Sequence, residues 1–125
     1  MRITRTEYLN KLIAFKDKQL IKVVTGIRRC GKSVLMEMYQ DWLLQNCIEQ
    51  DQIIAINFED MDFEELTDYK KLYAYLKDRL VPEKMTYIFL DEIQHVTDFP
   101  KVIDSLYIKK NVDIYVTGSN AYMLS

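Results

Sequence analysis

The sequence predicts an α/β fold in which helices cover both faces of a parallel β-sheet. Four short apolar runs alternate along the chain with longer segments whose apolar residues recur at helical spacing. The runs lack the period-two alternation of a strand with one wet face, which indicates strands buried on both sides. Strands that alternate with helices are typical of a parallel sheet. With 125 residues, 49% of them hydrophobic and 29% charged, the chain can form one domain with a real core.

The first half of the chain is predicted to contain two helices and two strands. Thr4-x-x-Glu7 has the pattern of a capping box, in which side chains satisfy the first free N–H groups of a helix. After Lys32, apolar residues recur at three- and four-residue intervals, which is typical of a helix with one buried side. In chain order the expected elements are a helix over 5–16, a strand over 21–25, a helix over 32–46 and a strand over 52–58.

The second half repeats this alternation. A helical apolar pattern that begins at Phe63 is expected to end before Pro82, because a proline ring cannot continue a helix. Pro100 stands where a short helix would begin, since proline is favoured in the first helical turn. In chain order the expected elements are a helical segment over 63–80, a strand over 87–90, a short helix over 100–107 and a strand over 113–117.

Residues 26–33, Gly-Ile-Arg-Arg-Cys-Gly-Lys-Ser, fit the phosphate-binding loop pattern G-x-x-x-x-G-K-[ST] at every constrained position. The loop lies between a predicted strand and a predicted helix, where backbone N–H groups and the helix dipole both attract an anion. Lys32 can reach the β- and γ-phosphates of a nucleotide, and the Ser33 hydroxyl can bind Mg²⁺. The predicted nucleotide-binding residues are Gly26, Ile27, Arg28, Arg29, Cys30, Gly31, Lys32, Ser33 and Val34.

Residues 87–92, Tyr-Ile-Phe-Leu-Asp-Glu, read as an apolar strand that ends in two acids, the pattern of a Walker B element. A parallel sheet places ligands at the carboxyl ends of its strands, so Asp91 is expected beside the phosphate loop. There its carboxylate can hold Mg²⁺ through water, and the predicted metal site consists of Ser33 and Asp91. Glu92 can orient and polarise the attacking water as catalytic base.

Two further strand ends carry polar residues that could face this site. At 116–120, Val-Thr-Gly-Ser-Asn, a small polar side chain could act as a sensor of the γ-phosphate or the water if this strand lies beside the acid-bearing one. Asn120 and Ser119 are the candidates, and an ordinary turn is the alternative. The segment 57–60, Asn-Phe-Glu-Asp, carries either a site-facing acid, Glu59, or an acidic loop that caps a helix.

Composition argues against several other classes of protein. A net charge of −2 gives no support for a nucleic-acid-binding face. No apolar run approaches the roughly 18 residues of a membrane span, so no membrane association is expected. Two cysteines, one of them inside the phosphate loop, fit a reducing, cytoplasmic location better than a disulfide framework. The single histidine, His95, excludes a His-rich metal site and is expected in a solvated loop.

Three motifs in this order resemble the N-terminal part of a prokaryotic AAA-type P-loop ATPase family whose members carry a C-terminal domain of unknown function. The motifs are the phosphate loop, Phe-Leu-Asp-Glu-Ile-Gln at 89–94 and Thr-Gly-Ser-Asn-Ala at 117–121. The resemblance covers the whole chain and implies a three-layer P-loop NTPase sandwich of the additional-strand type, with ATP and Mg²⁺ as cofactors. The roles that it implies are phosphate and Mg²⁺ binding by Lys32 and Ser33, metal binding by Asp91, base catalysis by Glu92 and sensing by Asn120 or Ser119.

The same resemblance implies that residues 1–125 form a partial domain that stops before the fifth core strand. An arginine finger, a lid and the C-terminal domain would also follow the last residue. Without the fifth strand, the first strand would be an edge with unpaired N–H and C=O groups, which invites pairing with another copy. We therefore expect this chain alone to self-associate, to bind ATP or ADP weakly and to hydrolyse ATP at a rate near background.

The favoured function is Mg-dependent ATP binding and hydrolysis that couples the nucleotide state to a conformational change in a larger protein. The adjacent acids Asp91 and Glu92 favour hydrolysis over the first alternative, a nucleotide-binding switch with negligible turnover. A second alternative is a P-loop kinase acting on a small molecule, with Asp60 or Glu59 as the acceptor-binding acid. A GTPase is disfavoured because the chain contains no Asn-Lys-x-Asp motif.

Overall fold

The computed structural model describes residues 5–18, 21–24 and 29–118. Helices and strands alternate through this part of the chain, with short 3-10 turns (η) between some of them. The elements are α1 (Arg5–Ala14), β1 (Ile21–Val24), α2 (Arg29–Gln45), η1 (Gln50–Gln52), β2 (Ile53–Asn57), η2 (Met61–Thr67), α3 (Tyr69–Asp78), β3 (Thr86–Asp91), η3 (Ile93–His95), α4 (Phe99–Tyr107) and β4 (Val112–Thr117).

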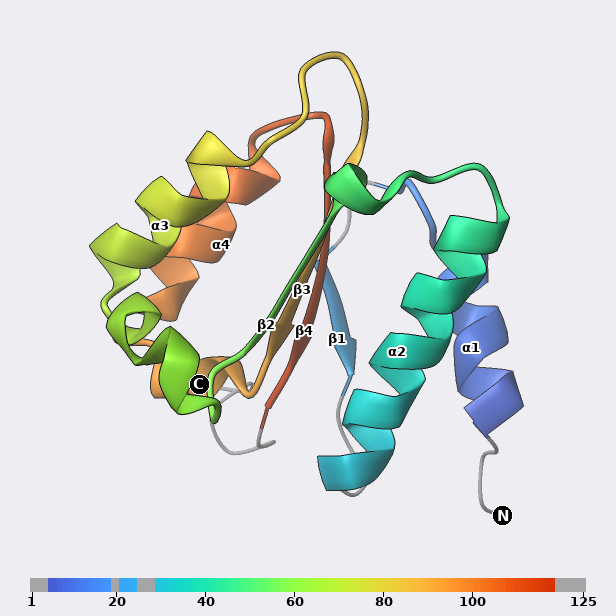
Figure 1. Ribbon diagram of the computed structural model, residues 1–125, viewed down its shortest axis with the longest axis horizontal. Coiled ribbons are helices and arrows are strands. Elements are labelled where there is room, and N and C mark those ends of the chain that lie inside the picture. The colour runs from blue at the N-terminus through green and yellow to red at the C-terminus, as the bar shows by residue number, and fades with distance from the viewer. Residues whose placement is uncertain (1–4, 19–20, 25–28, 119–125) are drawn as a thin grey trace.

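The four strands form one parallel sheet in the order β1-β4-β3-β2. Helices α1 and α2 cover one face of the sheet, and α3 and α4 cover the other (Figure 1). The three layers and the parallel sheet confirm the predicted fold class. Because β4 lies between β1 and β3, the end of the fourth strand stands beside the acid-bearing strand, as the additional-strand topology requires. All four strands point their carboxyl ends towards one edge of the molecule, where α2 begins (Figure 1).

The two central strands and the two outer strands differ in burial. β3 and β4 are buried along their whole length except for Asp91, which is half-buried. In β1 and β2, buried and exposed residues alternate, with Val23 48% exposed and Ala55 also exposed. Strands buried on both sides are therefore found only at the centre of the sheet. The partly uncovered β1 agrees with its expected edge position, and the partly uncovered β2 corrects the prediction. The reason is that each pair of helices spans only part of a four-stranded sheet, so one face of each outer strand stays in contact with solvent.

Three predicted boundaries need correction. Helix α2 begins at Arg29 and not at Lys32, so part of the phosphate-loop pattern is helical. Its first-turn N–H groups still lack intrahelical partners, so an anion can use them. The helical segment over 63–80 is in fact two elements, η2 and α3, because Asp68 is extended and its side chain accepts a hydrogen bond from the backbone N of Lys70 at 2.9 Å. Helix α1 ends at Ala14, before a turn in which Asp17 has a left-handed backbone (φ 64°).

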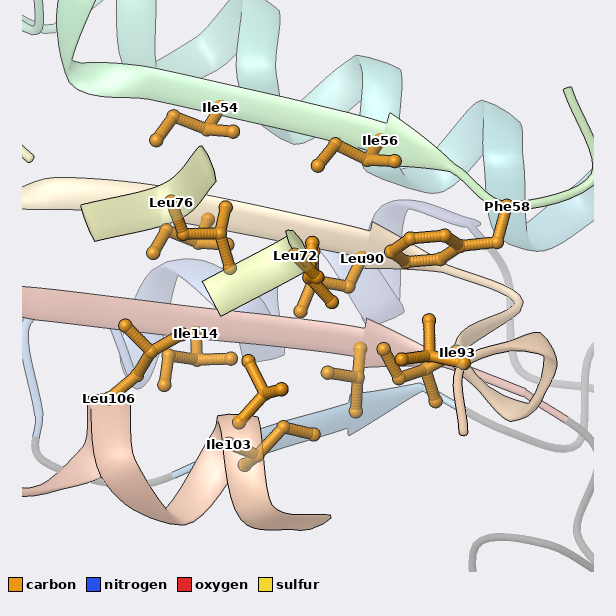
Figure 2. Packing of buried hydrophobic residues seen from close by; sticks show 14 of the residues in the cluster. Ile54, Ile56, Phe58, Leu72, Leu76, Leu90, Ile93, Ile103, Leu106 and Ile114 are labelled. Atoms are coloured by element: carbon orange, nitrogen blue, oxygen red, sulfur yellow. The ribbon is translucent and has the colours of Figure 1, made fainter. Parts of the chain in front are cut away.

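The core consists of two clusters, one on each face of the sheet. The cluster under α3 and α4 is almost entirely aliphatic and runs the length of the sheet (Figure 2). The cluster under α1 and α2 contains most of the buried aromatic rings. Its buried members are Leu12, Val24, Leu35, Met36, Tyr39, Leu43, Tyr87, Phe89 and Tyr115. Leu12 of α1 belongs to the same cluster as Leu35 and Leu43 of α2, so the two helices pack together over one face of the sheet.

Candidate functional site

The carboxylate of Asp91 is held by hydroxyl groups from two different elements. Ser33, in the second turn of α2, donates a hydrogen bond from Oγ to Asp91 Oδ2 at 2.7 Å. Thr117, the last residue of β4, donates from Oγ1 to Asp91 Oδ1. Both oxygens of the carboxylate are therefore engaged at the point where β3 and β4 end and α2 begins. The sequence predicted that Asp91 and Ser33 would meet here, and the fold brings them into direct contact.

The strand register explains why Asp91 reaches this position. Five buried residues, 86–90, carry β3 through the core, and Asp91 is the first side chain beyond them. Asp91 stands opposite Asn57 of β2, and its backbone O accepts a hydrogen bond from Phe58 N at 3.0 Å. Phe58 is itself buried in the aliphatic cluster. The end of β3 is thus fixed by backbone pairing on one side and by hydroxyl contacts on the other.

Glu92 is buried, with 6% of its surface exposed, although it directly follows the strand end. Its backbone is left-handed (φ 59°, ψ 54°), which costs a residue with a Cβ on the order of 1–3 kcal/mol. Its backbone N donates to Thr117 Oγ1 at 2.9 Å, and its side-chain Oε1 accepts from Gln94 Nε2 at 2.8 Å. The left-handed residue turns the chain sharply into η3. The candidate base is consequently held by both its backbone and its side chain.

Two residues at this site were missed as functional candidates from the sequence. Thr117 has no exposed surface and contacts both acids, whereas sequence reasoning chose its neighbours Ser119 and Asn120. The available signal was a hydroxyl residue closing an otherwise apolar strand next to the acid-bearing strand. Gln94 entered the sequence analysis only as part of the motif that carries the family resemblance. Its contact with Glu92 depends on the left-handed turn at Glu92, which the sequence does not reveal.

A hollow of about 240 Å³ adjoins the Asp91 carboxylate. It lies between the α2 side of the sheet and η2, and its lining is mixed, with polar groups next to the rings of two phenylalanines. The lining residues are Ser33, Met36, Glu37, Gln40, Ala55, Ile56, Asn57, Phe63, Phe89 and Asp91. The hollow gives solvent and small groups access to the Ser33 and Asp91 oxygens.

The Ser33 and Asp91 oxygens suit a hard cation such as Mg²⁺, which prefers oxygen ligands. Ser33 Oγ and Asp91 Oδ2 lie 2.7 Å apart, so a cation bound by the hydroxyl would be close enough to the carboxylate to be held by it through water. In the described part of the chain, no cluster of three or more His, Cys, Asp or Glu residues could hold a metal without further ligands.

The other predicted site residues fall into two groups. Ser119 and Asn120 lie outside the described residues, as do Gly26, Ile27, Arg28 and Thr4. The second group forms the start of helix α2. Its members are Arg29, Cys30, Gly31, Lys32, Ser33 and the half-buried Val34. The helical part of the phosphate-loop pattern therefore begins at the same edge of the sheet as the Asp91 carboxylate.

The segment after β2 combines both of the alternatives that the sequence left open. Asp60 caps η2, with Oδ1 accepting from Asp62 N at 2.9 Å. Glu59 Oε2 lies 3.7 Å from His95 Nε2, and His95 is exposed, as expected of a solvated loop histidine. Asn57 lines the hollow beside Asp91 and accepts a hydrogen bond from Glu59 N at 3.0 Å. The capping interpretation applies to Asp60, and Asn57 is the residue of this segment nearest to the candidate site.

Comparisons with known proteins agree with this geometry. Residues 18–125 match the sequence profile of a family described as AAA domain, whose members in general bind ATP with Mg²⁺ and hydrolyse it. An uncharacterized protein of Haemophilus influenzae is 39% identical over 124 residues, which are 98% of this chain and 31% of the relative. The chain thus spans about a third of the length of that relative. No solved structure matches the chain. Within the described residues, no helix is both long and apolar enough to cross a membrane.

Since the family profile covers most of the chain and the sheet has the strand order of an additional-strand ATPase, this chain belongs to the AAA domain family and has an AAA-type P-loop fold.

Proposed function

We propose that this domain binds ATP with Mg²⁺ at residues 26–34, hydrolyses it with Glu92 as base, and couples the nucleotide state to a conformational change in a larger protein. The observation that carries the proposal is the Asp91 carboxylate, which is hydrogen-bonded at once to Ser33 of α2 and to Thr117 of β4. The greater length of the Haemophilus influenzae relative supports the coupling to further domains.

In this proposal Ser33 and Asp91 hold the metal, and Lys32 binds the β- and γ-phosphates. Bound Mg²⁺ neutralises the charge that develops on the phosphates during transfer. The Ser33 hydroxyl exchanges its hydrogen bond to Asp91 for the cation, while Thr117 keeps the other carboxylate oxygen in place. The carboxylate therefore does not need to reorient when the site is loaded.

Glu92 accepts the proton of the attacking water in the proposed reaction. Thr117 joins the two acids, because its hydroxyl donates to Asp91 and accepts from the backbone N of Glu92. A displacement at the end of β4 would therefore move the metal ligand and the base together. The predicted sensors Ser119 and Asn120 are two and three residues beyond Thr117 in the sequence, so a γ-phosphate contact there would be transmitted to both acids.

Substitution of Glu92→Gln in the intact protein tests the chemistry. The amide fills the same space but cannot act as a base, so ATP binding should persist while turnover falls by about 10²- to 10⁴-fold. Glu64→Gln is the matched control, because Glu64 is an exposed glutamate of η2 with no proposed role in the site. Turnover and ATP affinity are measured on the same preparations. A Glu92→Gln variant that hydrolyses ATP at the wild-type rate would remove Glu92 from this role.

A nucleotide-binding switch with negligible turnover is the second candidate. It is favoured by the burial of Glu92 and by the Gln94 contact on its carboxylate, which together keep the base away from solvent. If the intact wild-type protein binds ATP but turns over no faster than its Glu92→Gln variant, the switch is the correct interpretation. The kinase alternative finds less support, because Asp60 is engaged in capping η2.

We also propose self-association through the outer edge of β1. β1 is the outermost strand on its side of the described sheet. Val23 of this strand is 48% exposed, and Phe15, in the turn after α1, is 45% exposed; both line a hollow of about 430 Å³ between α1 and β1. An exposed strand edge pairs readily with another copy. The molar mass of this chain in solution tests the proposal, and a strict monomer across the micromolar range would contradict it.

A further inference from the structure

Gln94 lies in the 3-10 turn η3, two residues after the candidate base Glu92. Its 3-10 turn, η3, is anchored in the aliphatic cluster by Ile93, which has no exposed surface, and by Val96, which is 2% exposed. The turn is closed by backbone hydrogen bonds from Val96 N to Ile93 O at 2.9 Å and from His95 N to Glu92 O at 3.3 Å. The Gln94 side chain therefore starts from a backbone that is fixed relative to Glu92.

The direction of the Gln94 amide follows from chemistry. Glu92 can act as a base only when it is ionised, and an ionised carboxylate only accepts hydrogen bonds, which agrees with Gln94 Nε2 as the donor 2.8 Å from Glu92 Oε1. The Gln94 Oε1 atom on the other side is buried and has no hydrogen-bond partner in the described part of the chain. Leaving a buried acceptor without a donor is unfavourable for folding. The Gln94 amide is therefore oriented so that its N–H group binds Glu92 while its buried oxygen is left without a hydrogen bond.

The structure assigns Gln94 as a positioning residue for the hydrolytic step, a role that rests on the proposed function of Glu92. Its N–H group holds Oε1 of the carboxylate in one orientation, so the base is set before the water and the nucleotide arrive. A donor on an ionised carboxylate makes a shorter and stronger hydrogen bond than a neutral pair. Gln94 neither gains nor loses a proton. The water proton goes to Glu92 while the water oxygen bonds to the γ-phosphorus and the bond to the ADP oxygen breaks.

The left-handed backbone of Glu92 and its carboxylate are held by different partners. A non-glycine residue in this region persists only where its surroundings over-determine it. Thr117 supplies the contact on the backbone N of Glu92, and Gln94 supplies the contact on the carboxylate. Loss of Gln94 should therefore release the carboxylate alone and leave the strand end in place.

The test compares kcat and ATP affinity in the intact protein for Gln94→Met and Gln94→Ala. Methionine keeps the length and packing of the side chain but has no donor, so the measurement remains valid if the alanine variant is poorly folded. We expect kcat to fall by about tenfold or more, the effect of losing a hydrogen bond to a charged group, while the Kd for ATP stays within about twofold. Gln50→Ala is the matched control, because Gln50 is an exposed glutamine that also lies in a 3-10 turn.

A double-mutant cycle separates positioning from general damage. If Gln94 acts through Glu92, Gln94→Met should cause no further loss of turnover and no change of ATP affinity in the Glu92→Gln background. Wild-type kcat in Gln94→Met, or an equal loss of ATP affinity in both backgrounds, would overturn the assignment. If Glu92→Gln abolishes turnover and Gln94→Met does not affect it, only the role of Gln94 falls. If Glu92→Gln itself retains turnover, the proposed function falls and the role of Gln94 falls with it.

Discussion

The two faces of the sheet are held by different kinds of interaction. Towards α3 and α4 the packing is aliphatic, with Leu72, Leu76 and Leu90 all fully buried and no buried ion pair in the cluster among the described residues (Figure 2). Towards α1 and α2 a buried ion pair, Lys22–Asp113, lies among tyrosines. One sheet therefore combines a face stabilised by non-directional burial with a face stabilised by directional contacts.

The directional contacts form a chain from one element to the next. Asp113 of β4 contacts Lys22 Nζ of β1 and accepts from Tyr115 OH at 2.7 Å. The Tyr115 hydroxyl lies 2.7 Å from the hydroxyl of Tyr39, which belongs to α2. Asp113 also accepts from the backbone N of Asp17, in the turn between α1 and β1, at 2.9 Å. These contacts link α2 and the turn before β1 to the same residue of β4.

This difference has a consequence for the candidate site. Aliphatic side chains can slide or repack at modest cost, whereas a satisfied buried polar network permits few arrangements. Helix α2 begins in the phosphate-loop pattern, and Tyr39 ties it to the strand that ends in Thr117. The polar face thus fixes the position of the loop helix relative to the strand ends, while the aliphatic face supplies the bulk of the burial.

The difference between the polar and the aliphatic faces should have its largest effect at alkaline pH, where the protein is expected to unfold. Burial raises the pKa of Tyr39, Tyr87 and Tyr115, all on the polar face, and the nearby Asp113 or Asp17 carboxylates add to the shift. A raised folded-state pKa gives stability that is complete below the unfolded value of about 10 and is lost as pH rises beyond it.

Absorbance at 295 nm and circular dichroism, followed together from pH 8 to 13, check this prediction. Three of the nine tyrosines should ionise only in step with unfolding. Ionisation of all nine phenols while the circular dichroism stays native would show that these hydroxyls are not buried as described.

The next largest effect is expected from Asp113→Ala. Asp113 is 1% exposed, and its removal takes away the ion-pair partner of the buried Lys22, which costs about 3–5 kcal/mol. Urea unfolding of the chain measures the change, with Asp104→Ala as control because Asp104 is an exposed aspartate of α4. The control should cost no more than about 0.5 kcal/mol. Equal losses for the two variants would mean that the polar face contributes nothing specific.

A smaller effect is expected from a volume-conserving change on the aliphatic face. Leu90→Met keeps the volume of a fully buried side chain and should cost less than about 1.5 kcal/mol, whereas Leu90→Ala should cost about 2–5 kcal/mol because it leaves a cavity. The same urea experiment applies, with the exposed Ile108→Ala as control. If Leu90→Met is as damaging as Asp113→Ala, the two faces do not differ in tolerance.

The sequence was sufficient for the layers, the parallel sheet and the meeting of Ser33 with Asp91. These depend on long apolar patterns and on a loop motif whose spacing already encodes a strand, a turn and a helix. The exposed side of Val23 agrees with the expected edge position of the first strand, whereas the exposed Ala55 of β2 was not foreseen, because coverage of that strand depends on where the helices on each face end. The contacts of Thr117 and Gln94 were not foreseen, because they require the strand order and the left-handed turn at Glu92.

The most direct test of the central claim is a calorimetric titration of the intact protein with ATP, in Mg²⁺ and in EDTA, for the wild type and for Asp91→Asn. If Asp91 and Ser33 form the metal site of an ATP-binding domain, the wild type should bind ATP at least about tenfold more tightly with Mg²⁺, the effect of one charge-assisted contact. The Asp91→Asn variant should lose most of that difference, while Asp104→Asn should keep it. Equal Mg²⁺ dependence in the wild type and in Asp91→Asn would contradict the account.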